Sequence, residues 1–165
     1  AFDTPETIYF LDLDEETGEV VGTVRFNSTL NPHLLSEVFH GLCSASVPRS
    51  PYIWEATRYI TDTQRYPDWQ NARSRARLAL ALNEYALDNN IKQMSWLTTV
   101  PLYRKMNKLW STSPLGLPEY FEDDDNTYVA AISTFSRRAS RILTQRLGAI
   151  IEFEPTASDK PTQRA

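Results

Sequence analysis

Residues 7–27 read TIYFLDLDEETGEVVGTVRFN, and this stretch decides how the fold is interpreted. Two runs rich in β-branched and aromatic residues flank EETG, which is typical of a turn, so the stretch predicts a β-hairpin. Side chains alternate along a strand, so Val24 and Phe26 share the more apolar face while Thr23 and Arg25 share the other. Arg25 is therefore either an exposed strand residue or a buried and paired one, and the sequence leaves both readings open.

The chain after the hairpin alternates extended and helical patterns. Further predicted elements are a short helix at 33–39, a strand at 52–61, a helix at 71–89 with Asn71 as N-cap, a strand at 91–100, a helix opened by Pro101, a strand at 127–133, a helix at 136–147 and a candidate last strand in AIIEF, 149–153. This order predicts one α/β (α+β) domain over residues 1–154, with a mixed sheet flanked by helices. The polar segment 155–165 is expected to be a disordered tail.

Composition sets limits on the class of protein. With 165 residues, 41% of them hydrophobic and 23% charged, the chain has the balance of one ordinary globular domain. A single cysteine, Cys43, excludes an intramolecular disulfide and a cysteine-based metal site. The net charge of −4 argues against general nucleic-acid binding. No apolar run is long enough to cross a bilayer, so we expect a cytoplasmic protein with no membrane span.

Charge is unevenly distributed along the chain. Residues 1–20 are rich in acidic residues and contain no basic one, whereas 65–77 are rich in arginine. The arginines of the second segment are Arg65, Arg73, Arg75 and Arg77. A local basic patch on an acidic chain suits a phosphorylated or acidic partner, and a solvated helix face is the alternative interpretation.

Signatures of several common chemistries are absent from the sequence. His33 and His40 have no metal-ligand spacing, so a packing or surface role is favoured over metal binding. There is no GxSxG motif of an α/β-hydrolase, and the five glycines form neither a GxGxxG motif nor a P-loop. Nucleotide binding by those two routes is excluded.

Ionisable residues in strand-like surroundings form the strongest constellation: Asp3, Arg25, Glu55 and Arg58. If they face inward, they must pair with one another or with a ligand, because an isolated buried charge is costly; an exposed sheet face is the alternative. Glu55 and Arg58 have opposite parity, so both can serve one site only if a β-bulge re-aims one of them. A carboxylate between guanidinium groups stays ionised and can accept a proton.

The strings FDTPETIYFL, VVGTVRFNSTLNPHLLSEVF and YIWEATRYITD resemble the LuxI-type N-acyl-homoserine-lactone synthases, which are autoinducer synthases with a GNAT-like acyltransferase fold. The matching motifs are Phe2-Asp3, Val24-Arg25-Phe26, Pro32 to Phe39, and Glu55-Ala56-Thr57-Arg58-Tyr59. The resemblance covers about residues 2–133. Members of this family carry a further N-terminal segment that closes over S-adenosylmethionine, and this chain begins after it, so we expect weak or no activity from the chain alone.

The resemblance implies an acyltransferase with two substrates. The amine of S-adenosylmethionine attacks an acyl thioester of acyl carrier protein or coenzyme A, and the methionine carboxylate then closes onto its own γ-carbon. The products are a quorum-sensing lactone and methylthioadenosine. S-adenosylmethionine is then a substrate, and no cofactor or metal is implied. The alternatives are another GNAT-type N-acyltransferase and a non-catalytic domain that binds an acyl carrier.

The resemblance also implies roles for the polar residues. Glu55 is the expected base that deprotonates the amine, directly or through a water. Asp3, Arg25 and Arg58 match the charge cluster that orients Glu55 and shapes the S-adenosylmethionine pocket. The cleft is lined by Phe39 and by the backbone of Tyr59.

An acyl pocket is expected between the sheet and the helices that follow it, lined by Trp96, Thr98, Thr99 and Met106. Trp96 stands where a family threonine often favours 3-oxo chains, which predicts a shortened or differently shaped pocket; plain core filling is the alternative. The stretch before the 71–89 helix lacks the glycine loop that holds a pyrophosphate. A phosphopantetheine arm or a carrier protein would instead contact Arg73, Arg75 or Arg77, together with the basic faces Arg104, Lys105, Lys108 and Arg137, Arg138, Arg141.

Overall fold

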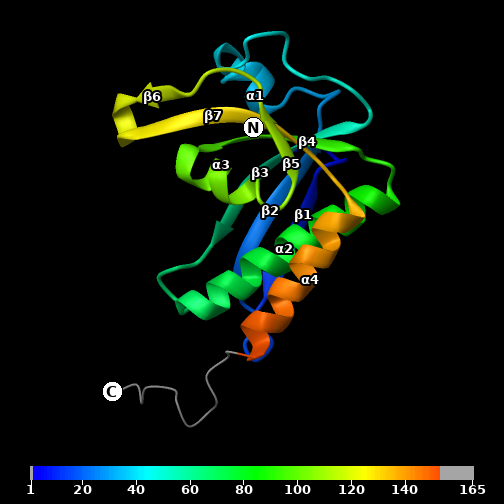
Figure 1. The fold of residues 1–165 in the computed structure, drawn as a ribbon, viewed down its shortest axis with the longest axis vertical. Helices are drawn as coiled ribbons and strands as arrows, with labels where there is room; N and C mark the ends of the chain where they lie inside the picture. Colours follow the sequence, from blue (N-terminus) through cyan, green and yellow to red (C-terminus); the bar gives the residue numbers. More distant parts are fainter. Residues whose placement is uncertain (1, 153–165) are drawn as a thin grey trace.

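A seven-stranded sheet forms the centre of the computed structural model, which describes residues 2–152 (Figure 1). Its strands are β1 (Ile8–Leu13), β2 (Val20–Ser28), β3 (Ile53–Thr61), β4 (Gln93–Thr99), β5 (Ser111–Pro114), β6 (Glu119–Phe121) and β7 (Asn126–Thr134). The order is β1-β2-β3-β4-β7-β5, and β6 also pairs with β7. The β3–β4 pair is parallel and the others are antiparallel, which confirms the predicted hairpin and mixed sheet.

Helices lie on both faces of this sheet. The two long helices, α2 (Asp68–Asp88) and α4 (Arg137–Glu152), run side by side across one face (Figure 1). The short elements are α1 (Leu34–Glu37), η1 (His40–Leu42), α3 (Val100–Met106) and η2 (Glu122–Asp124). Among the helices of the described residues, none is both long and apolar enough to cross a membrane.

Each face of the sheet has its own apolar core. The larger core joins β2, β4 and β7 to α2 and α4 and includes Phe26, Trp96 and Leu143. The smaller core gathers Leu35, Leu42 and Ala130 beneath α1 and η1. Ala130 and its neighbour Ala131 belong to different cores because adjacent side chains of β7 point to opposite faces.

Three sequence predictions about secondary structure are wrong. The α2 helix begins at Asp68 with Pro67 as its N-cap, so Asn71 lies buried inside the first turn, where its Nδ2 donates to the carbonyls of Tyr66 and Pro67. The expected last strand is instead the end of α4, because Leu143, Arg146 and Ile150 continue a helical spacing along one groove.

The third error is the segment between α3 and β7, where the sequence predicts no strand. It contains β5 and β6; the Ser, Thr and Pro content of β5 hides the usual alternation of a strand, and β6 is only three residues long, too short to show one. The predicted helix at 33–39 is also shorter, since α1 covers only Leu34–Glu37. The expected tail at 155–165 and the domain boundary at 154 lie outside the described residues.

The β3 and β4 strands separate after a short ladder. Their parallel pairing joins Ile53–Glu55 to Gln93–Ser95, and both strands continue beyond it without pairing to each other. Glu55 is therefore the last β3 residue paired with β4. Beyond it, side chains from both strands and from the helices enclose a cavity of about 240 Å³.

Candidate active site at the separation of β3 and β4

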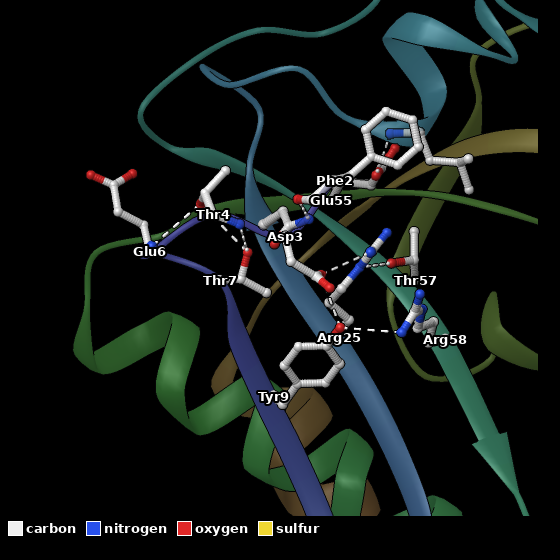
Figure 2. Close-up of polar contacts among 12 residues, drawn as sticks. Phe2, Asp3, Thr4, Glu6, Thr7, Tyr9, Arg25, Glu55, Thr57 and Arg58 are labelled. Atoms are coloured by element: carbon white, nitrogen blue, oxygen red, sulfur yellow. Dashed lines mark hydrogen bonds and ion pairs between the residues drawn. The ribbon is translucent and has the colours of Figure 1, made fainter.

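A polar network connects the start of the chain to β2 and β3 (Figure 2). The Asp3 carboxylate accepts a hydrogen bond from the Tyr9 hydroxyl at 2.9 Å and forms an ion pair with Arg25 at 3.0 Å. Arg25 Nε also donates to Thr57 Oγ1 at 2.9 Å, and Arg58 donates to the Tyr9 hydroxyl at 3.3 Å. The structure thus brings together Asp3, Arg25 and Arg58, with Tyr9 as the link between Asp3 and Arg58, whereas the hydrogen bonds of Glu55 go to backbone amides of α1.

Burial decides the question that the sequence left open about Arg25. Its exposure is 3%, so it is the buried and paired residue rather than the exposed one. The Asp3 side chain is 49% exposed. The hydrogen bond from Tyr9, and then the hydrogen bond and charge of Arg25, lower the pKa of the Asp3 carboxyl, which favours the ionised form that Arg25 needs as a partner.

A β-bulge in β3 aims two neighbouring side chains in opposite directions. Arg25 pairs with Thr57 and Thr23 pairs with Ile60, so one β2 residue lies opposite both Arg58 and Tyr59. The backbone of Arg58 has φ +53°, a left-handed conformation. In a regular strand Arg58 would face α2. The bulge turns Arg58 toward Tyr9 and packs Tyr59 against the larger core, which confirms the bulge that the spacing of Glu55 and Arg58 requires.

Glu55 is held by the backbone at the start of α1. Its two carboxylate oxygens accept hydrogen bonds from the amides of Leu34 at 2.9 Å and Leu35 at 2.7 Å. Glu55 is 2% exposed, and this burial raises the pKa of its carboxyl despite the opposing effect of the two amide bonds. A buried carboxylate with a raised pKa is a stronger base than an exposed one.

Three residues of this region were not assigned to the site from the sequence. Tyr9 lies opposite Arg25 in the β1–β2 ladder, and Thr57 lies opposite Arg25 in the β2–β3 ladder, so strand register is the signal that finds both. His33 is fully buried at the N-cap of α1, in keeping with the packing role favoured from the sequence. Its Nδ1 lies 2.9 Å from the Asn31 carbonyl oxygen.

The cavity between the separated strands, called the acyl cavity below, is largely apolar. Its walls come from β3, β4, α2 and α3, and they include Trp96, Thr98 and Met106 as expected. Thr99, which was also expected here, is not part of this lining. Trp96 Nε1 donates to Ser133 Oγ at 2.9 Å, which fixes the indole that forms one wall.

A separate cavity of about 380 Å³ lies on the face of the sheet opposite to α2 and α4. It is lined by Phe39, Leu97, Phe121, Asp123, Asp124 and Tyr128. Leu97 also lines the acyl cavity, so the two spaces approach each other across β4. Phe39, expected to line a substrate cleft, is placed here.

The arginine-rich segment is only partly available to a partner. Arg77 forms ion pairs with Glu15 at 3.0 Å and Asp12 at 3.5 Å, and Arg65 pairs with Glu19 at 2.9 Å. The uneven charge of the sequence is therefore partly internal pairing between the hairpin and the α2 region. Arg75 is exposed, and the Arg73 guanidinium lies 5.2 Å from the centroid of the Trp69 ring.

The residues described provide no metal centre. Among them, no group of three or more His, Cys, Asp or Glu side chains is arranged to hold a metal ion. The groups present at the separation of β3 and β4 are a buried carboxylate, paired guanidinium groups and a largely apolar cavity.

Comparison with known proteins identifies the family. The family profile described as autoinducer synthase matches residues 1–142. An isovaleryl-homoserine lactone synthase of Bradyrhizobium diazoefficiens is 33% identical over 151 residues, covering 90% of this chain and 65% of that protein. An acyl-homoserine-lactone synthase of Aeromonas salmonicida is 30% identical over 112 residues, covering 66% of this chain and 53% of that protein.

A solved structure agrees with these relatives. The CoA-dependent acyl-homoserine lactone synthase BjaI, with SAM and isopentyl-CoA, superposes with a TM-score of 0.77 at 30% identity, covering 90% of this chain and 67% of that one. The expected GNAT-like fold is thereby confirmed. The chain spans about two thirds or less of the length of these relatives. Its match over most of its length shows that the chain belongs to the autoinducer synthase family.

Proposed function

We propose that this protein makes an acyl-homoserine lactone from S-adenosylmethionine and an acyl thioester. The observation that carries the proposal is the position of Glu55, a buried carboxylate at the point where β3 and β4 separate and the acyl cavity begins. BjaI, whose structure contains SAM and isopentyl-CoA, supports the choice of substrates. S-adenosylmethionine is consumed as a substrate, and the proposed site of action is the cytoplasm.

The first chemical step is N-acylation. The substrate ammonium has no lone pair, so it must lose a proton before the nitrogen can attack the thioester carbonyl. Glu55, with its raised pKa, accepts this proton directly or through a water, while the α1 amides hold the carboxylate in place. The nitrogen–carbon bond forms, the carbon–sulfur bond of the thioester breaks, and the donor leaves as a thiol.

The second step is lactonisation. The methionine carboxylate attacks its own γ-carbon, a carbon–oxygen bond forms, and the bond from that carbon to the sulfonium breaks. Its electron pair stays on sulfur, so methylthioadenosine leaves as a neutral thioether. Asp3, Arg25 and Arg58 hold a fixed pattern of charge beside Glu55 and orient the amino acid part of the substrate.

Release of methylthioadenosine tests this function. Incubation of the full-length protein with S-adenosylmethionine and mixed acyl donors is expected to yield methylthioadenosine and lactone, whereas another N-acyltransferase or a carrier-binding domain forms neither. Glu55→Gln is expected to lower the rate by at least about 100-fold, the usual range for loss of a general base. The acid limb of the kcat/KM profile should lie above the ordinary pKa of a glutamate and be absent from the variant. Normal circular dichroism of Glu55→Gln is the control, and full activity of a folded variant contradicts the assignment.

The phosphopantetheine arm or the carrier protein of the acyl donor is proposed to contact the exposed side of α2. Arg75 is exposed there, whereas Arg73, two residues earlier, is half-buried on a different side of the helix with its guanidinium over the Trp69 ring. The double variant Arg73→Glu, Arg75→Glu is expected to raise the KM for an acyl carrier protein thioester while leaving kcat close to that of the wild type, because charge complementarity mainly affects encounter. An unchanged KM for both carrier protein and CoA donors removes this surface from the proposal.

A further inference from the structure

A second, largely apolar cavity, the outer cavity, lies behind the acyl cavity between α2, α3 and α4, and its lining also includes Arg75, Lys105 and Arg146. Its volume is about 240 Å³, equal to that of the acyl cavity. Four residues line both spaces: Tyr59, Ala79, Leu102 and Met106. The two cavities are therefore neighbours that share a wall built by β3, α2 and α3.

Tyr59 is the tethered member of this wall. Its hydroxyl donates to the backbone carbonyl of Arg75 on α2 at 2.6 Å, so the ring is fixed across the space between β3 and the helix. Burial raises the pKa of the Tyr59 hydroxyl, which keeps it protonated and able to donate. Ala79 has only a methyl group, and Leu102 and Met106 make no polar contact through their side chains.

The bulge explains why a tyrosine occupies this position. Without the extra residue at Arg58, side-chain alternation would direct Tyr59 to the opposite face of the sheet and an arginine toward α2. One backbone feature therefore serves both sides, because it adds Arg58 to the polar network and aims the Tyr59 ring between the two cavities.

We propose that the Tyr59 side chain sets the maximum acyl chain length by closing the acyl cavity against the outer cavity. The inference rests on the proposed function, because it takes the acyl cavity as the site of the donor chain. An acyl chain that fits the acyl cavity gains affinity with every methylene buried there. A longer chain meets the Tyr59 ring and gains nothing further, although an apolar space of equal size lies directly behind it.

Binding of a homologous series of ligands, measured without turnover, tests whether Tyr59 forms this partition between the acyl cavity and the outer cavity. Straight-chain S-acyl pantetheines from butanoyl to dodecanoyl serve as probes, and tryptophan fluorescence reports occupancy because Trp96 and Trp110 line the acyl cavity. In the wild type, affinity should rise about fourfold per methylene, the equivalent of ~0.8 kcal/mol, up to a limiting length and then level off. In Tyr59→Ala the rise should continue to longer chains. Tyr59→Leu serves as a second opening variant if the alanine variant does not fold.

Two further variants test whether the limit depends on the Tyr59 ring rather than on its hydroxyl hydrogen bond or on a general loosening of the packing. Tyr59→Phe keeps the ring and should retain the limit of the wild type. Ala76 is 8% exposed and lines the outer cavity but not the acyl cavity, so Ala76→Leu in the Tyr59→Ala background should fill the opened space and restore the shorter limit.

The outcomes distinguish this inference from the proposed function. An identical limit in the wild type and the opening variants, or no limit in the wild type, overturns the partition, while methylthioadenosine release by the wild type still supports synthase activity. The expected shift in limiting length without any methylthioadenosine release by the full-length protein supports the partition and contradicts the proposed synthase. Absence of acyl pantetheine binding in the wild type overturns the acyl cavity and the partition together.

Discussion

The two faces of the sheet meet at the separation of β3 and β4, and they are stabilised in different ways. On the face covered by α1, buried charged groups are held by specific partners, as when Arg25 contacts Asp3 and Thr57. On the face covered by α2 and α4, aromatic and aliphatic side chains pack around two cavities. The polar face depends on direction and pairing, whereas the apolar face depends on the shape and volume of its side chains.

This difference teaches how a single strand can serve two chemistries. Alternation in β3 sends Glu55 and Thr57 to the polar face and Trp54 and Ala56 to the apolar face. The bulge at Arg58 then shifts the alternation by one residue, so the strand contributes Arg58 to one face and Tyr59 to the other. Substitutions on the two faces should therefore differ in what they disturb.

The largest effect is expected from Trp96→Ala on the apolar face. Loss of a buried indole should lower the free energy of unfolding by about 3–5 kcal/mol, because the neighbouring core collapses only partly into the space. The same variant should shift donor preference toward bulkier or longer acyl chains. Chemical denaturation and donor profiling measure the two effects. Trp69→Ala, outside the apolar cores, is the matched control with a small loss of stability. An unchanged donor preference leaves Trp96 as core filling alone.

A smaller effect is expected on the polar face, where Arg25→Met and Arg58→Met form a matched pair. Arg25 is 3% exposed, so its loss removes the hydrogen bond to Thr57 and the ion pair with Asp3 and should cost about 1–3 kcal/mol. Arg58 is exposed, and its replacement should change stability by less than about 0.5 kcal/mol. Urea denaturation of both variants measures the contrast. Equal losses would contradict a network anchored by the buried guanidinium.

The smallest effect concerns the backbone that links the two faces. Arg58 has φ +53°, which a β-branched residue adopts poorly and glycine adopts freely. Arg58→Val should therefore be less stable than Arg58→Gly by about 1–2 kcal/mol, although neither side chain can replace the hydrogen bond to Tyr9. Thermal unfolding of the two variants provides the measurement. If valine is tolerated as well as glycine, the bulge is not held in the conformation described.

Much of the fold was predictable because its signals are local. The hairpin, β3, β4 and β7 have β-branched and aromatic runs, and the apolar stripe Leu78, Leu82 and Ala86 marks α2. The short strands β5 and β6 have no such pattern and exist because β7 offers them an edge for pairing. The end of α4 was misassigned because a short apolar run fits a helix or a strand equally well.

The candidate site was predictable to a different degree. Motif order and spacing selected Asp3, Arg25, Glu55 and Arg58, and parity alone showed that a bulge was needed for Arg58. The sequence could not place Tyr9 in the network, because that position depends on the register between β1 and β2. It also could not show that Arg77 is already paired with the acidic hairpin.

By itself the sequence determined the type of most elements, the residues able to carry chemistry and the family to which the chain belongs, because propensity and motif spacing are properties of neighbouring positions. Only the tertiary structure decided which ionisable residues are buried and which are paired with one another. It also decided that two equal cavities lie on either side of Tyr59. Burial, pairing and cavity shape arise from segments far apart in the chain, and their energies depend on surroundings that no local pattern encodes.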